Sequence, residues 1–212
     1  MVTANLRNIR QVTGRSNSFR MKRIVLKYNF NINDDMIDNM NQTNSTWEPN
    51  YSEAAQYWVK KDRSSRKMPQ DILRSKVEDI INSHKTCALA TGFEDQIRCT
   101  PIEYNYHKGC FYLFSEGGIK FKGLERNKNV CLAVYDEYSG FGKLCGLQVS
   151  GQAEIIEPFS PEYLELLNIK NIPEEAMKKA DHPLYLIKIV PEEAEVLSSA
   201  FKEDGYDIRQ KI

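Results

Sequence analysis

Four polar side chains stand at the ends of consecutive expected strands and have the chemistry to hold a phosphate. Arg98 and Thr100 occupy alternate positions of one run, Ser115 closes the next, and Lys120 follows a Gly-Gly pair. A phosphate dianion is held best by charge-assisted donors, and an arginine can bind it through two parallel hydrogen bonds. The chain has no P-loop sequence, so the predicted anion site is built from side chains.

The elements that must position these residues read as antiparallel strands. The alternation of residues 97–106 places Arg98 and Thr100 on one face of a strand. Glycines at 146 and 151 predict bends or bulges in a long strand. The expected strands are 86–91, 97–106, 110–114, 130–135, 144–156 and 184–190, and the expected helices are 69–84, 120–127, 161–167 and 173–179. Glu192, Glu193 and Glu195 are interpreted as the solvated face of a further helix.

The 212 residues suffice for one domain with tails. Residues 1–50 are expected to be a disordered or non-native tail, 51–68 a lead-in, 69–204 the folded domain and 205–212 a C-terminal tail. The first 27 residues carry seven basic side chains and no acid. This resembles an organelle transit peptide, and the alternatives are a disordered tail or a start upstream of the true one. We therefore expect a cytoplasmic protein, or an organellar one if the basic segment is a transit peptide.

Charge and composition argue against several classes of function. Residues 1–67 hold 12 basic and 6 acidic side chains, which leaves 17 of the 29 basic and 23 of the 29 acidic ones to residues 68–212. A mildly acidic body predicts no nucleic-acid partner. No apolar run approaches the roughly 20 residues of a membrane span.

The five cysteines form no Cys-x-x-Cys pair, and we interpret them as small buried side chains in a reducing compartment. The three histidines are scattered along the sequence and predict no metal site.

The order of these residues resembles that of the flavin-binding split barrels similar to pyridoxamine 5'-phosphate oxidase. The segments that carry the resemblance are ALATGFEDQIRCTPIEYNY, GCFYLFSEGGIKFKGLERNKNVCLAVYDE and GLQVSGQAEIIE. They contain an Arg shortly after a turn, a hydroxyl closing the next strand, and a Lys four residues before a Leu, with an Asn and a valine-rich strand beyond. In this chain those positions are Arg98, Ser115, Lys120, Leu124, Asn127 and Val130.

The resemblance implies a mainly β protein with flanking helices (α+β), built as a six-stranded antiparallel Greek-key split barrel. It implies FMN bound at a homodimer interface, with Arg98 and Lys120 on the phosphate. Ser115 would bond the phosphate or the ribityl chain, and Thr100 would point to the same place. Gln148 would take the place of a glutamine that the family carries on the long strand near Gly146. Glu103 inverts the charge of a basic residue usual in the oxidase, which argues against oxidation of pyridoxamine phosphate itself.

Three functions follow as hypotheses. The first is an FMN-dependent oxidoreductase that passes a hydride through flavin N5 to a small-molecule substrate, with a nicotinamide nucleotide as a transient donor because no Rossmann fingerprint is present. It needs no catalytic side chain beyond the cofactor, and none is assigned. The second is a flavin-binding or sensing module without turnover. The third is a haem-handling split-barrel protein, which would need a histidine from among His84, His107 and His182 as the axial ligand.

Overall fold

A computed structural model describes residues 48–212, so the predicted N-terminal tail lies almost wholly outside the described residues. The chain divides into two units at Tyr57/Trp58, and every strand within residues 48–212 belongs to the second unit. Helix α3 (Tyr51–Asp62) runs across that division. Asn50 begins it: the Oδ1 atom accepts a 3.0 Å hydrogen bond from the backbone N–H of Glu53, which satisfies one of the unpaired donors of the first turn.

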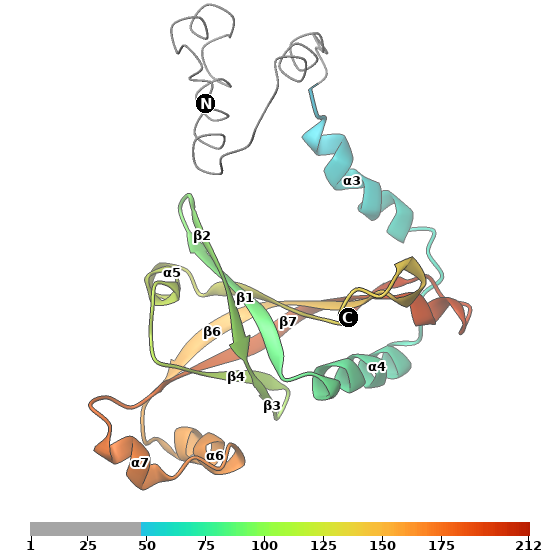
Figure 1. Ribbon diagram of the computed structural model, residues 1–212. Helices are drawn as coiled ribbons and strands as arrows, with labels where there is room; N and C mark the ends of the chain where they lie inside the picture. The colour runs from blue at the N-terminus through green and yellow to red at the C-terminus, as the bar shows by residue number, and fades with distance from the viewer. Residues whose placement is uncertain (1–47) are drawn as a thin grey trace, which may run out of the picture. The chain divides into compact units, whose positions relative to one another are not determined.

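The second unit is one antiparallel sheet with helices packed on it (Figure 1). Its elements, in chain order, are α4 (Gln70–Ser83), β1 (Thr86–Phe93), β2 (Gln96–Glu103), β3 (Asn105–His107), β4 (Cys110–Ser115), α5 (Lys120–Arg126), β5 (Asn129–Tyr135), the 3-10 helix η2 (Phe141–Lys143), β6 (Cys145–Ile156), α6 (Pro161–Ile169), α7 (Glu174–Lys179), β7 (Tyr185–Ser198), the 3-10 helix η3 (Ser199–Lys202) and β8 (Arg209–Lys211). The strand order is β2-β1-β5-β6-β7-β4-β3, with β8 paired to β7. Strand β2 also contacts β4, so the sheet curls into a half-barrel.

The expected six-stranded Greek-key arrangement is not confirmed, because the sheet has eight strands. The two additional strands are three residues long. Strand β3 is the end of the run expected at 97–106, separated from β2 at Tyr104, and β8 arises from the segment expected to be a tail. Strand β7 extends to Ser198, so the residues interpreted as a further helix, Glu192, Glu193 and Glu195, belong to a strand and that interpretation is wrong.

Two apolar clusters hold the sheet and its helices together. The larger lies on the inner face of the sheet, where Leu89, Leu113, Leu132 and Ile187 are fully buried, and the α4 residues at helical spacing pack against it. The smaller lies beneath α6, where Tyr163 and Leu166 cover β4 and β7. Burying such side chains stabilises the fold by about 1.5–3 kcal/mol each.

A β-bulge confirms one of the two predicted irregularities in β6. The register between β6 and β7 shifts at Ser150/Gly151. A Cβ atom on Gly151 would lie 2.2 Å from the carbonyl oxygen of Val190. The two backbones approach here more closely than any side chain allows, so this position requires glycine.

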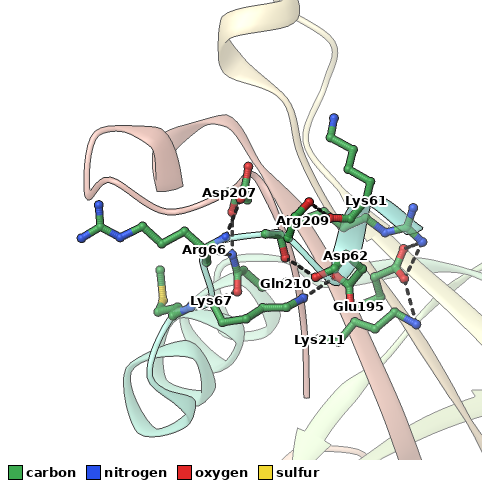
Figure 2. A network of polar contacts seen from close by, with 12 residues as sticks. Lys61, Asp62, Arg66, Lys67, Glu195, Asp207, Arg209, Gln210 and Lys211 are labelled. Atoms are coloured by element: carbon green, nitrogen blue, oxygen red, sulfur yellow. Dashed lines mark hydrogen bonds and ion pairs between the residues drawn. The ribbon is translucent and has the colours of Figure 1, made fainter. Parts of the chain in front are cut away.

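Two C-terminal residues, Asp207 and Gln210, are hydrogen-bonded to the segment that precedes α4, and Figure 2 shows this polar network. We call these hydrogen bonds the C-terminal clasp. Gln210, 1% exposed, accepts a 3.0 Å hydrogen bond from the backbone N–H of Met68 and donates to the carbonyls of Arg66 (3.1 Å) and Asp207 (2.7 Å). The Asp207 carboxylate in turn accepts a 2.6 Å bond from the N–H of Arg66. Segments expected to be a lead-in and a tail are thus joined to the domain between them.

A further ion-pair group continues this network on the sheet. Arg209 contacts Glu195 across β7–β8 at 2.5 Å, and Lys211 joins the same carboxylate at 3.4 Å. The guanidinium of Arg209 also lies 4.7 Å from the ring centre of Trp58, at cation–π distance. Within residues 48–212 no helix is both long enough and apolar enough to cross a membrane.

Candidate functional site

Arg98 and Thr100 share the inner face of the sheet, as the alternation predicts. Arg98 stands directly opposite Thr91 across the β1–β2 ladder, and Thr100 stands opposite Leu89. Directly opposed residues of an antiparallel pair point to the same face. Leu89 and Thr91 are 0% and 3% exposed, so this face is the interior one. Arg98 lies near its rim and remains exposed, whereas Thr100 is half-buried.

Lys120 is buried at the start of α5, the helix that packs over the ends of β1 and β2. Its side chain is only 8% exposed. The Nζ atom donates a hydrogen bond to the carbonyl of Gly117 and lies 5.5 Å from the ring centre of Phe121. Burial, and after it the neighbouring charge of Arg98, lowers the pKa of Lys120. In the described part of the chain neither cation forms an ion pair, so two positive charges converge without a counter-ion.

Ser115 ends β4 and is 7% exposed. Its Oγ accepts a 3.1 Å hydrogen bond from the N–H of Gly117 and lies 3.3 Å from the carbonyl of the same residue. Gly117 and Gly118 have φ values of 126° and 104°, a region that side-chain-bearing residues rarely adopt. Ser115 therefore fixes the turn that presents Lys120, and its hydroxyl lies beside that lysine through their shared partner, Gly117.

A buried hydroxyl that the sequence interpretation missed belongs to the same region. The Oγ1 atom of Thr91 has no hydrogen-bond partner within residues 48–212, although the residue is only 3% exposed. Buried polar groups are nearly always paired, so an unpaired one indicates a missing partner. Gly123 of α5 lies directly over it, since an added Cβ there would be 3.5 Å from Oγ1. The one available signal was position: Thr91 alternates with Cys87 and Leu89 on the buried face of β1.

A cavity of about 360 Å³ lies where the β1–β2 hairpin meets α5. Arg98, Thr91, Lys122 and Gly123 line it, together with one carboxylate, Asp95. A second cavity, of about 470 Å³, lies around the other side of the same hairpin and is lined by Ala90, Cys131 and Ser150 among others. The smaller cavity is lined by Arg98 and by Ile119 and Lys122, which flank Lys120 in the sequence, and it is therefore the candidate ligand site.

Gln148 does not join these residues within one chain. It stands opposite Ala133 on β5 and Glu195 on β7, and it is exposed between the buried Leu147 and Val149. Gln148 thus faces away from the interior, on the sheet face opposite Arg98. It lines a third cavity, of about 430 Å³, with Tyr135 and Leu197 among its other walls.

The remaining residues of interest are engaged elsewhere. His84 lies 2.9 Å from a carboxylate oxygen of Asp136, and His107 lies 3.0 Å from one of Glu165. Glu103, the residue with inverted charge, forms an ion pair with Lys170 of α6. No group of three or more His, Cys, Asp or Glu side chains in residues 48–212 is arranged to hold a metal ion. The cysteines are free, but only Cys87 is buried and Cys99 is exposed, so the expectation of five buried thiols is wrong.

The structure is a curled antiparallel half-barrel, and a cavity lined by Arg98, Lys122 and Asp95 lies where the β1–β2 hairpin meets α5. The family model described as pyridoxamine 5'-phosphate oxidase matches residues 73–198, more than half of the chain. The chain belongs to this family. No curated protein matches it significantly.

Solved structures of similar fold come from several bacteria. Campylobacter jejuni ChuZ superposes with a TM-score of 0.53 at 14% identity, covering 69% of this chain and 61% of that one. The conserved hypothetical protein Rv2991 of Mycobacterium tuberculosis gives 0.51 at 22% identity, covering 64% and 88%. A FAD-binding protein from Mesorhizobium loti gives 0.47 at 18% identity, covering 57% and 89%. At these identities the likeness concerns the fold.

Proposed function

We propose that this protein binds FMN through its phosphate at Arg98 and Lys120, and that it is a flavin-dependent oxidoreductase. The observation that carries the proposal is the buried ammonium of Lys120, which has Arg98 as a neighbour and no carboxylate partner in the part of the chain that the structure describes. A buried charge is costly unless it is paired. A phosphate dianion between the two cations would remove that cost and would supply charge-assisted hydrogen bonds.

The residues around the pair fit a phosphate ester. Thr91 has a buried hydroxyl that no described residue bonds, and Thr100 shares the face of Arg98. The glycines at 117 and 118 let the backbone come close to whatever Lys120 holds. These groups can donate to phosphate oxygens, whereas an uncharged ligand would leave the two cations unpaired.

The site is organised for binding rather than for acid–base chemistry. None of the residues assigned to it is a histidine or a carboxylate, although Asp95 lines the adjoining cavity. A bound flavin supplies the hydride chemistry, at its N5 atom, and the protein's part is then to anchor and orient it. A small-molecule substrate and a transient nicotinamide nucleotide donor complete the proposed reaction.

The proposal includes a homodimer with the flavin at the interface. Gln148 lies on the sheet face opposite Arg98, so it can serve the same ligand only from a second copy. That outer face carries large exposed apolar side chains, including Ile97 and Tyr135 at 84% and 62% exposed. Covering them against a second copy would remove apolar surface from water.

Absorbance and titration test the proposal. The purified full chain should be yellow, or should take up added FMN with a change in flavin fluorescence. Arg98→Ala and Lys120→Ala should each weaken FMN binding by about 1.5–3 kcal/mol, the range for a hydrogen bond to a charged group. Arg74→Ala and Lys85→Ala remove exposed cations that form no ion pair with any described residue, and they should leave the affinity unchanged.

Two further outcomes separate the alternatives. Steady-state oxidation of NADH or NADPH by the flavin-loaded protein would distinguish an enzyme from a non-catalytic carrier. An intense absorbance band at the violet edge of the spectrum would indicate haem. Two of the three candidate haem ligands, His84 and His107, already contact carboxylates, which favours a flavin over haem and leaves the exposed His182 as the axial ligand to test. A colourless protein that binds neither FMN nor haem would overturn the proposal.

A further inference from the structure

A row of three rings begins beside Lys120 and runs away from the cation pair. Phe121 contacts Tyr185 with ring centres 4.8 Å apart, and His182 stacks on Tyr185 with an interplanar angle of 29°. We define this set of Phe121, Tyr185 and His182 as the ring row. Lys120 lies over its first member at 5.5 Å.

The ring row and the anion site share one turn of the backbone. Tyr185 stands directly opposite Ser115 across β4–β7. Its ring lies 3.8 Å from where a Cβ on Gly117 would be, and the carbonyl of that glycine accepts the hydrogen bond of Lys120. A ligand phosphate on Lys120 would therefore lie beside Tyr185.

The outer part of the ring row is open to solvent. Tyr185 is 41% exposed and His182 is exposed, although aromatic rings at strand positions are normally core. A mononucleotide held at the cations by its terminal phosphate would have no further group with which to cover these rings. A dinucleotide carries a second phosphate and a base beyond the first phosphate. For the second phosphate the cavity at Arg98 offers a further cation, Lys122, which forms no ion pair among the described residues.

We propose that the ring row is a second subsite, which stacks the adenine of a dinucleotide flavin whose phosphates lie on Arg98, Lys120 and Lys122. The inference rests on the proposed flavin function and extends it from FMN to FAD. An adenine presents two flat faces, and stacking of a base on an aromatic side chain contributes about 1–3 kcal/mol. The isoalloxazine half would occupy the same place in both ligands, since the anchoring phosphate is shared.

Parallel titrations of the full chain with FMN and FAD test the subsite. Wild-type protein should bind FAD at least as tightly as FMN. Tyr185→Ala and His182→Ala should each weaken FAD binding about tenfold, the effect of losing one stacked base, while FMN affinity changes less than about twofold. Tyr185→Phe and His182→Phe keep a ring at each position and should keep the affinity for FAD.

The outcomes separate this inference from the function beneath it. If wild-type protein binds FMN but not FAD, or if Tyr185→Ala weakens both flavins equally, the second subsite is refuted and the proposed function stands. If neither flavin binds the wild-type protein, both fail. A loss of FAD affinity confined to the alanine variants supports the subsite.

Discussion

Thr91 and Arg98 stand directly opposite each other across the β1–β2 ladder, and neither has the partner expected for its side chain within the described residues. Thr91 has a buried hydroxyl without a hydrogen bond, and Arg98 has a guanidinium without an acid among the described residues. One anion bound at this end of the half-barrel could accept a hydrogen bond from the Thr91 hydroxyl and pair with the Arg98 guanidinium. The pair therefore connects the stability of the free protein to its affinity for a ligand.

Replacing Thr91 by valine should stabilise the ligand-free protein and weaken ligand binding. Valine has nearly the same shape and removes the unpaired hydroxyl, whose burial costs about 1–3 kcal/mol. We expect the free energy of unfolding in denaturant to rise by about 1 kcal/mol. Thr86→Val, at an exposed position of the same strand, should change it by less than about 0.5 kcal/mol. A lower stability for Thr91→Val would show that the hydroxyl has a partner.

Lys120 should make stability depend on pH in a direction set by its lowered pKa. The folded state binds this proton less tightly than the unfolded state, so stability rises with pH between the lowered value and the ordinary lysine value. Lys120→Met lacks this contribution. The stability difference between wild type and Lys120→Met, measured from pH 7 to pH 10, should therefore move in favour of wild type as pH rises. A difference that does not change with pH would contradict the lowered pKa.

The strands and the face of Arg98 could be predicted from the sequence because they depend on local alternation. Residues 97–103 alternate, and the structure places Arg98 and Thr100 on the same side. Gln148 could not be placed in the same way. Its position relative to Arg98 depends on the register of β1 with β5 and of β5 with β6, and no local pattern encodes the register between strands.

The C-terminal strand was missed for a related reason. The three residues of β8, Arg-Gln-Lys, have no apolar alternation, and their pairing to β7 is held by ion pairs to Glu193 and Glu195. Those acids looked like a solvated helix because their partners come from a segment distant in the sequence. The ring row was missed likewise, since Phe121 and Tyr185 meet only when β7 returns beside β4.

Gln210→Ala should be among the more destabilising substitutions near the C-terminus. The substitution removes three hydrogen bonds and leaves the buried N–H of Met68 without its Gln210 acceptor. At about 1 kcal/mol for each bond, with a penalty for the unpaired donor, we expect a loss of about 2–4 kcal/mol. Gln96→Ala, at an exposed position of β2, is the control and should stay within about 0.5 kcal/mol. Equal midpoints in urea would mean that the clasp is not part of the cooperative fold.

Tyr112 and Glu162 join β4 to α6, and their hydrogen bond of 2.7 Å should make stability sensitive to acid. The phenol of Tyr112, and then Lys188, lower the pKa of the Glu162 carboxyl. A carboxyl with a lowered pKa contributes stability above its unfolded value, and the contribution is lost as pH falls through the folded value. Tyr112→Phe should therefore destabilise the protein more at pH 7 than at pH 3 in matched denaturant titrations. A constant difference would exclude the carboxylate as the partner that matters.

Glycines 146 and 151 lie on the same strand and should respond very differently to an added methyl group. At Gly151 a Cβ would lie 2.2 Å from the carbonyl oxygen of Val190, so the bulge between β6 and β7 must open. At Gly146 the nearest atom, the Cβ of Tyr135, would be 3.8 Å away, an ordinary contact. Gly151→Ala should cost more than about 3 kcal/mol or prevent folding, and Gly146→Ala less than about 1 kcal/mol. Thermal unfolding followed by circular dichroism measures both, and similar midpoints for the two variants would show that the backbones at the bulge can separate.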